Sequence, residues 1–292
     1  MILNMNIQTA KQLYISDNKG TNHYGGDQGW FTSNTRAMGG CSSIAAANAL
    51  RLLCQHNNEL LDAISSYANI PWPVKNSLCS TTPTKEDYSI FMTGVYNTIG
   101  TGEIFPLNKL YDKGTRGRKI FRIFKPTLGR SSIGFILGII KFARKFDINI
   151  KVNTLTTAFI NPAKARNFIE NGLSKSGSVV MLTSYNAMDL KLIPSSCRFD
   201  SVNDIPCAKA TTSNHFTTIT NISDDQLLIS TWGQAATASF SSIAKSWRSY
   251  KAYESTLFYI EPCTKSESIK CMLTCMIPFI RGFISTITRH HI

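Results

Sequence analysis

The pattern of apolar positions divides the chain into a helical half and a strand-rich half. In the first half, apolar residues recur every three or four positions, which is the spacing of one face of an α-helix. The clearest case is Cys41–His56, which is rich in the strong helix formers Ala, Leu and Arg. Further helices are predicted at residues 59–68, 85–99 and 133–146. The first forty residues, rich in Gly, Asn, Asp and Thr, are predicted to form loops.

From residue 148 onwards, short runs of alternating apolar and polar residues predict half-buried β-strands. The predicted strands are residues 148–156, 178–185, 215–222, 226–232, 236–240 and 256–260, with helices at 162–173 and 242–247. The polar turn Ser223-Asp224-Asp225 between two of these runs predicts a hairpin. Because helices and strands are segregated rather than alternating, we expect an α+β fold with an antiparallel sheet.

Composition agrees with a folded protein and excludes several classes. Of the 292 residues, 43% are hydrophobic, which is enough for a substantial core and excludes a disordered chain. Eight cysteines in a chain of this length are too few for a disulfide-stapled miniprotein. The sequence contains no C-x-x-C pair, so a clustered structural zinc site is not expected. No signal-peptide pattern is evident, and the most apolar stretches, residues 133–140 and 272–280, are too short to span a bilayer. We therefore expect a cytoplasmic protein without a metal or cofactor.

Positive charge is concentrated in one region of the chain. There are 31 Lys and Arg against 18 Asp and Glu, a net charge of +13, and ten of the basic residues lie at 113–145 with no acidic residue among them. We interpret this block as a basic insertion, either a solvated face or a surface for nucleic acid or anionic lipid. Residues 263–292 form an apolar and basic tail. It either lies peripherally on a membrane, docks on a partner, or packs as an ordinary C-terminal element.

Cys41 stands where a thiol becomes reactive. It begins the predicted helix directly after Gly39-Gly40, where backbone N–H groups without intrahelical partners and the helix dipole favour a negative charge. Such a position lowers the pKa of a thiol, and the same N–H groups can donate hydrogen bonds to an oxyanion. The alternative is an inert buried cysteine. We predict that Cys41 is a nucleophile.

His215 is the best-placed base for this nucleophile, because it opens the first strand of the predicted hairpin. The other histidines lie in the N-terminal loops, at the far end of the Cys41 helix or at the C-terminus: His23, His56, His290 and His291. Folding the hairpin brings Ser230 roughly opposite His215, where its hydroxyl could orient the imidazole. Trp232 follows and is predicted to shield this contact from water. A structural role for His215 is the alternative.

The segments GGCSSIAAANAL, NHFTTIT and LLISTWG together resemble the papain-like cysteine peptidase superfamily, especially the bacterial branch that resembles bacteriocin-leader peptidases. In that superfamily a Cys opens the central helix of a helical half, and a His and then an Asn or Asp come from the sheet half. The resemblance covers residues 27–262 and implies a papain-like domain at residues 1–262, with the basic insertion inside it. It also implies a glutamine that binds the oxyanion, for which Gln28 is the candidate and Asn34 the rival.

The resemblance implies acyl-transfer chemistry on a peptide or amide substrate. Cys41 would attack the carbonyl, His215 would take and return a proton, and Ser230 would orient His215. Water as the acceptor gives a peptidase or amidase, and an amine or thiol gives an acyltransferase.

Two other classes of function stay open. Ser230 stands where the family has Asn or Asp, and twelve residues separate Gln28 from Cys41, which fits a catalytically inactive papain-like binding module. The basic block by itself fits a nucleic-acid-binding protein.

Overall fold

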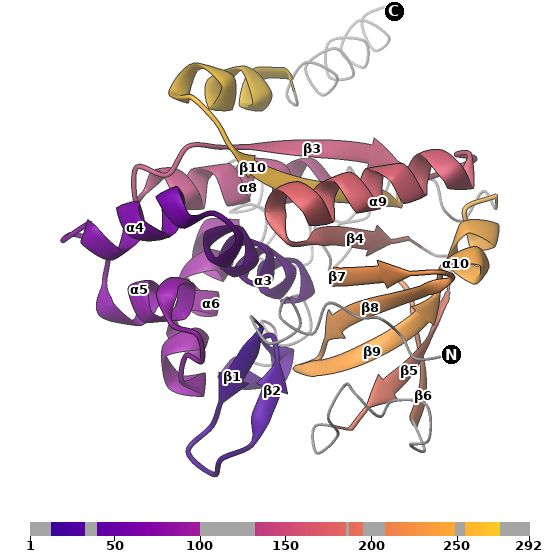
Figure 1. Ribbon diagram of the computed structural model, residues 1–292, viewed down its shortest axis with the longest axis horizontal. Helices are drawn as coiled ribbons and strands as arrows, with labels where there is room; N and C mark the ends of the chain where they lie inside the picture. Colours follow the sequence, from indigo (N-terminus) through magenta and orange to yellow (C-terminus); the bar gives the residue numbers. More distant parts are fainter. Residues whose placement is uncertain are drawn as a thin grey trace, which may run out of the picture.

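The fold consists of a group of helices packed against one large antiparallel sheet (Figure 1). The computed structural model describes residues 13–32, 40–99, 132–184, 187–194, 208–248 and 255–274. Helices dominate up to residue 99 and strands dominate the second half, as expected. The described part of the chain therefore confirms the α+β class and the antiparallel sheet.

The central helix α3 (Cys41–His56) has the predicted bounds, and its residues from 41 to 54 are all buried. It contacts α5, α6, α9 and strand β7, so neighbours cover it on several sides. Around it lie α4 (Asn58–Ser66), α5 (Trp72–Cys79) and α6 (Lys85–Ile99). The sequence pattern did not predict α5, because prolines at 71 and 73 were interpreted as a helix end. Helix α4 does end before these prolines, as predicted, but they also lie at the start of α5, where a missing N–H removes no intrahelical bond.

The sheet has the strand order β3-β10-β4-β7-β8-β9-β5-β6, and each neighbouring pair is antiparallel. Its strands are β3 (Ile150–Thr156), β4 (Val179–Thr183), β5 (Met188–Ile193), β6 (Ala208–Thr212), β7 (His215–Ser223), β8 (Gln226–Thr231), β9 (Gln234–Ser239) and β10 (Thr256–Pro262). Strands β7 and β8 form the predicted hairpin. The pattern did not predict β5 and β6, nor the small sheet of β1 (Tyr14–Ser16) and β2 (Asn22–Tyr24) in the region expected to be loops.

The two faces of the sheet bury separate apolar clusters. Alternate residues of β4 show the division. Val180 and Leu182 belong to the cluster under α3, α6 and α8 (Ser132–Arg144). Val179 and Met181 belong to the cluster under α9 (Pro162–Ser176) and α10 (Phe240–Ser246). This alternation follows from the two-residue period of a strand. The sheet is therefore covered on both faces.

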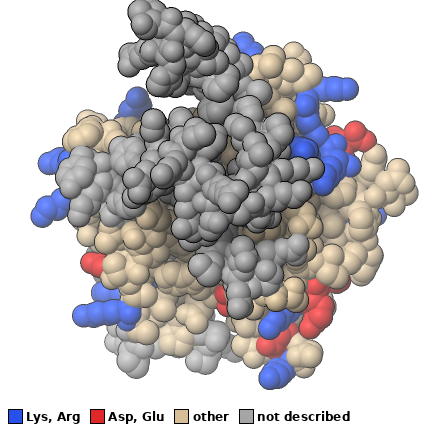
Figure 2. All heavy atoms as spheres, turned by 180° about the vertical axis from the view of Figure 1, so that it is seen from behind, with Lys and Arg blue, Asp and Glu red and all other residues tan. Residues whose placement is uncertain are grey.

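The described part of the basic block contains a helix whose apolar side belongs to the core. Helix α8 buries Phe135, Ile139 and Ile140 completely, while its Lys141 side chain is exposed. Figure 2 shows Lys and Arg of the described residues spread around the margin of one face, with Asp and Glu among them. The stretch with most of the basic residues, 100–131, lies outside the described residues.

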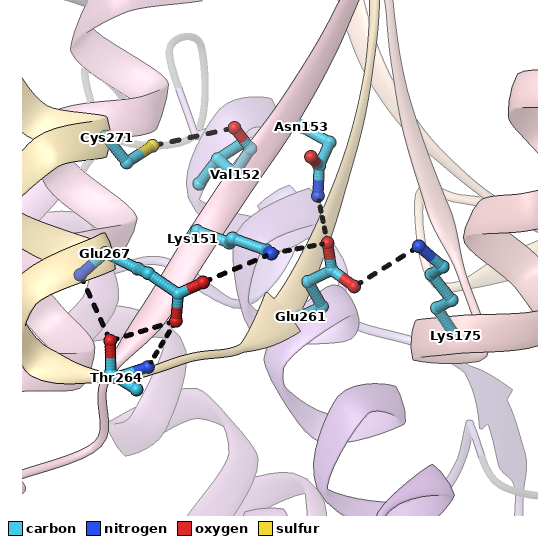
Figure 3. Close-up of polar contacts among 8 residues, drawn as sticks. All are labelled: Lys151, Val152, Asn153, Lys175, Glu261, Thr264, Glu267 and Cys271. Carbon is cyan, nitrogen blue, oxygen red and sulfur yellow. Dashed lines mark hydrogen bonds and ion pairs between the residues drawn. The ribbon is translucent and has the colours of Figure 1, made fainter. Parts of the chain in front are cut away.

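The first part of the predicted tail packs beside the sheet. Residues 265–274 form a helix next to β3 and β10 (Figure 3). The Lys151 Nζ atom lies 3.3 Å from a carboxylate oxygen of Glu261 and 4.0 Å from one of Glu267. This partly exposed network contributes modestly to stability. The tail from residue 275 onwards lies outside the described residues. None of the described helices is both long enough and apolar enough to cross a bilayer.

Candidate functional site

A narrow cavity lies where the start of α3 meets the open end of the β7–β8 hairpin. Its volume is about 10 Å³, which is room for about one water molecule. The lining comes from α3, the hairpin and the short helix η1 (Gln28–Trp30): Gln28, Cys41, Ile44, Ala45, Asn48, His215, Phe216, Thr218, Ser230, Thr231 and Trp232. Five of the six side chains that the sequence singled out for catalysis, oxyanion binding or shielding therefore line one cavity.

Cys41 is the first residue of α3 and is 6% exposed. Gly40 forms the N-cap, so no side chain caps the first turn of the helix, and the Gly40 carbonyl accepts hydrogen bonds from the Ser43 and Ile44 N–H groups. The positive end of the helix dipole therefore lies next to the thiol, as the sequence predicted.

His215 is the first residue of β7 and is 8% exposed. Its Nε2 atom lies 2.9 Å from the Thr231 hydroxyl oxygen, within hydrogen-bond distance. Burial lowers the pKa of His215 to about 4, because the charged imidazolium is costly in a site with little water. The imidazole is therefore neutral at pH 7.

Trp232 covers the imidazole. The turn between β8 and β9 has only two residues, Trp232 and Gly233, with φ angles of 49° and 69°. Two consecutive positive φ angles match the tight turn that suits the twist of a hairpin. The indole stacks on His215 with 5.1 Å between ring centroids and 30° between planes. This agrees with the shielding position expected for Trp232.

The register of the hairpin differs from the expected one. Ser230 pairs with Thr218 rather than His215, so the prediction that Ser230 lies opposite the imidazole is wrong. The Ser230 hydroxyl instead donates to the Tyr24 carbonyl at 2.7 Å and accepts from the Asn48 side chain at 3.1 Å. Thr231, one residue later, points to the other face of β8 and contacts the imidazole. One position in a strand decides which face a side chain occupies.

Backbone pairing brings Gln28 to the cavity. The Tyr24 N–H donates to the Gly233 carbonyl at 2.8 Å, and the Gly233 N–H donates to the Gly26 carbonyl at 3.0 Å. These bonds join the segment before η1 to the turn that carries Trp232. Gln28 is therefore next to Cys41's helix despite the twelve residues between them in sequence. The rival candidate Asn34 lies outside the described residues.

The other described histidines lie elsewhere. His23 on β2 is 3.4 Å from the Asp17 carboxylate, and His56 at the end of α3 is 2.7 Å from the Ser174 carbonyl oxygen. His290 and His291 are outside the described residues. Among the residues the structure describes, no three His, Cys, Asp or Glu side chains gather in a way that could hold a metal ion.

Sequence reasoning missed Asn48 and Thr231. Asn48 follows Cys41 by seven residues, or two helical turns, so the two lie on the same face of α3. A polar residue at that spacing on an otherwise apolar face was a usable signal. Thr231 had no such signal, because only the strand pairing distinguishes it from Ser230.

No known protein-family model matches the chain, and no curated protein matches it significantly.

Proposed function

We propose that the protein is a papain-like cysteine peptidase or amidase with Cys41 as nucleophile and His215 as general base. The observation that carries the proposal is that these two residues, far apart in sequence, line one cavity at the start of a buried helix and of a sheet strand. The mixed helix-and-sheet architecture and the order of the motifs add support. The substrate supplies a carbonyl carbon in a peptide or amide bond.

In the proposed mechanism, the Cys41 sulfur attacks the substrate carbonyl carbon while its proton passes to the neutral His215. With Nε2 held by Thr231, the proton goes to Nδ1 of His215. The backbone N–H at the start of α3 and the Gln28 amide stabilise the oxyanion. His215 then returns the proton to the leaving amine, and a thioester on Cys41 remains. Water, activated by His215, releases the acyl group and restores the thiol.

Thr231, rather than Ser230, orients the imidazole in this proposal. Replacing Thr231 by Val keeps the shape of the side chain and removes the hydroxyl that lies 2.9 Å from His215. We expect Thr231→Val to slow alkylation of Cys41 by about tenfold, since a lost orienting bond leaves the base misplaced. The measurement is the rate of iodoacetamide labelling at pH 7. An unchanged rate would remove Thr231 from this role.

Selective alkylation tests the proposed nucleophile itself. At neutral pH, iodoacetamide should label Cys41 faster than the other seven cysteines, as measured by mass spectrometry of peptides. Cys54, in the same helix, is the internal control, because burial raises the pKa of its thiol and makes it a poor nucleophile. His215→Ala should slow labelling of Cys41 and leave Cys54 unchanged. Equal labelling of Cys41 and Cys54 would reject the proposal.

A second candidate function is an inactive binding module of the same fold. It is favoured by the neutral hydroxyl of Thr231, which holds an imidazole less firmly than the carboxylate or amide of the family. Turnover distinguishes the two candidates. A peptidase or amidase cleaves members of a fluorogenic peptide library and loses this activity in Cys41→Ala. A binding module reacts with iodoacetamide at Cys41 but cleaves none of the peptides. Transfer to an added amine in place of water would identify an acyltransferase.

A further inference from the structure

Asn48 is the centre of a buried hydrogen-bond network beside the cavity. Its Nδ2 atom donates to the hydroxyls of Ser230 at 3.1 Å and Thr218 at 3.4 Å. Its Oδ1 atom accepts from the Gly26 N–H at 3.1 Å and the Tyr88 hydroxyl at 2.8 Å. These four bonds use the full capacity of the amide. Since an unpaired buried amide is costly, the network favours one arrangement of its members.

The donors and acceptors of these bonds show how the network holds the short segment Tyr24–Gly26. The Tyr24 carbonyl can only accept, so the Ser230 hydroxyl donates to it and receives the Asn48 hydrogen bond on a lone pair. The Gly26 N–H can only donate, so it binds the Asn48 oxygen. Asn48 and Ser230 thus hold the residues on either side of Gly25. Gly25 has a φ angle of 78°, and a Cβ atom there would collide with both side chains.

The opposite side of the same segment pairs with the backbone of Gly233, through one bond from Tyr24 and one to Gly26. Gln28 follows two residues after Gly26, at the start of η1, which Asp27 caps by accepting from the Gly29 N–H at 2.9 Å. The position of Gln28 relative to Cys41 therefore depends on contacts from α3, β8 and the β8–β9 turn.

We propose that Asn48 and Ser230 are positioning residues that set the Gln28 side chain at the oxyanion site of Cys41. Neither touches the reacting atoms in this proposal. Because Asn48 lies on the same helix face as Cys41, its bonds to Ser230 and Gly26 fix the distance between that helix and the segment carrying Gln28. The inference rests on the proposed function, in which Gln28 donates to the oxyanion, and assigns Ser230 a role other than orienting His215.

Two reagents for Cys41 separate oxyanion stabilisation from thiol reactivity. With p-nitrophenyl acetate, the thiol adds to the ester carbonyl, its proton passes to His215, and a tetrahedral oxyanion forms. The oxyanion collapses, p-nitrophenolate leaves, and an acetyl thioester remains on Cys41. With iodoacetamide, the thiol proton again passes to His215 and the sulfur displaces iodide at a saturated carbon, so no oxyanion forms. The ratio of the acylation rate to the alkylation rate therefore reports on the oxyanion donors alone.

We expect Gln28→Ala to lower this ratio by about 100-fold and Ser230→Ala by about tenfold, because removal of an oxyanion donor costs more than its displacement. The double variant should be no slower than Gln28→Ala, since Ser230 acts through Gln28. Thr220→Val is the matched control. It also removes a buried hydroxyl bonded to Tyr24, but at the phenol rather than at the backbone carbonyl, and should keep the wild-type ratio.

The outcomes separate the inference from the proposed function. A wild-type ratio in Ser230→Ala, or full additivity with Gln28→Ala, would overturn the inference and leave the Cys41–His215 proposal intact. If Cys41 is acylated no faster than Cys54 in the wild type, the proposed function itself fails. Asn48→Asp tests the same link if Ser230→Ala does not fold, because it keeps Oδ1 and replaces the Nδ2 donor. A wild-type ratio in Asn48→Asp would also overturn the inference.

Discussion

Replacing Gly25 by Ala is expected to lower the free energy of unfolding by about 3 kcal/mol. The φ angle of 78° costs a residue with a Cβ atom about 1 to 2 kcal/mol. The added Cβ also collides with Ser230 and Asn48, and such overpacking in a tight site costs about 1 to 3 kcal/mol more. The measurement is equilibrium unfolding in urea, monitored by tryptophan fluorescence.

Gly20 provides a matched control for this prediction. It has nearly the same φ angle, 76°, but no atom lies within 4 Å of the position that a Cβ would take. Gly20→Ala is therefore expected to cost only the backbone strain, about 1 kcal/mol. Equal losses of stability in the two variants would contradict the close approach of Asn48 and Ser230 to Gly25.

The second large effect is a loss of stability in mild acid that depends on His215. Burial holds the pKa of the folded-state imidazole at about 4, whereas an unfolded chain takes up this proton near pH 6.5. Between these values the unfolded state binds more protons, so the free energy of unfolding falls as the pH falls. Because of His215, the free energy of unfolding is expected to be about 2 to 3 kcal/mol lower at pH 4.5 than above pH 6.5.

Urea unfolding at a series of pH values measures this slope. The comparison is with His215→Gln, whose side chain does not titrate, so the wild type should lose about 2 to 3 kcal/mol more than the variant over the same range. The carboxylates with lowered pKa, such as Asp17 and Asp225, are present in both proteins and cancel in the difference. Parallel slopes for the two proteins would show that His215 is exposed to water.

Local patterns predicted most of the elements in the described chain. Helices α3 and α6 have the predicted bounds, because apolar periodicity and good helix formers act within one segment. The elements that the pattern missed depend on partners. Strands β1 and β2 have three residues each, and strand β6 is mostly exposed, so their own side chains carry a weak strand signal. Helix α5 was missed because proline marks helix starts as well as helix ends.

The candidate site divides in the same way. The position of Cys41 at a helix start is a property of the sequence around it, and so is the position of His215 at a strand start. The partner of the imidazole is not, because Ser230 and Thr231 are adjacent hydroxyl residues and only the register of β7 with β8 decides which one faces His215. Asn48 needed the same tertiary information, since its four partners come from separate segments.

By itself, the sequence determined that this is an α+β protein with a cysteine at the start of its central helix. Those features arise from periodicity and helix-end chemistry, which operate over a few residues. Only the tertiary structure decided that Gln28, Cys41 and His215 share one cavity, that Thr231 contacts the imidazole, and that Ser230 binds Asn48. The physical reason is that strand register and loop return depend on hydrogen bonds between segments distant in the chain, and no local pattern records which of them pair.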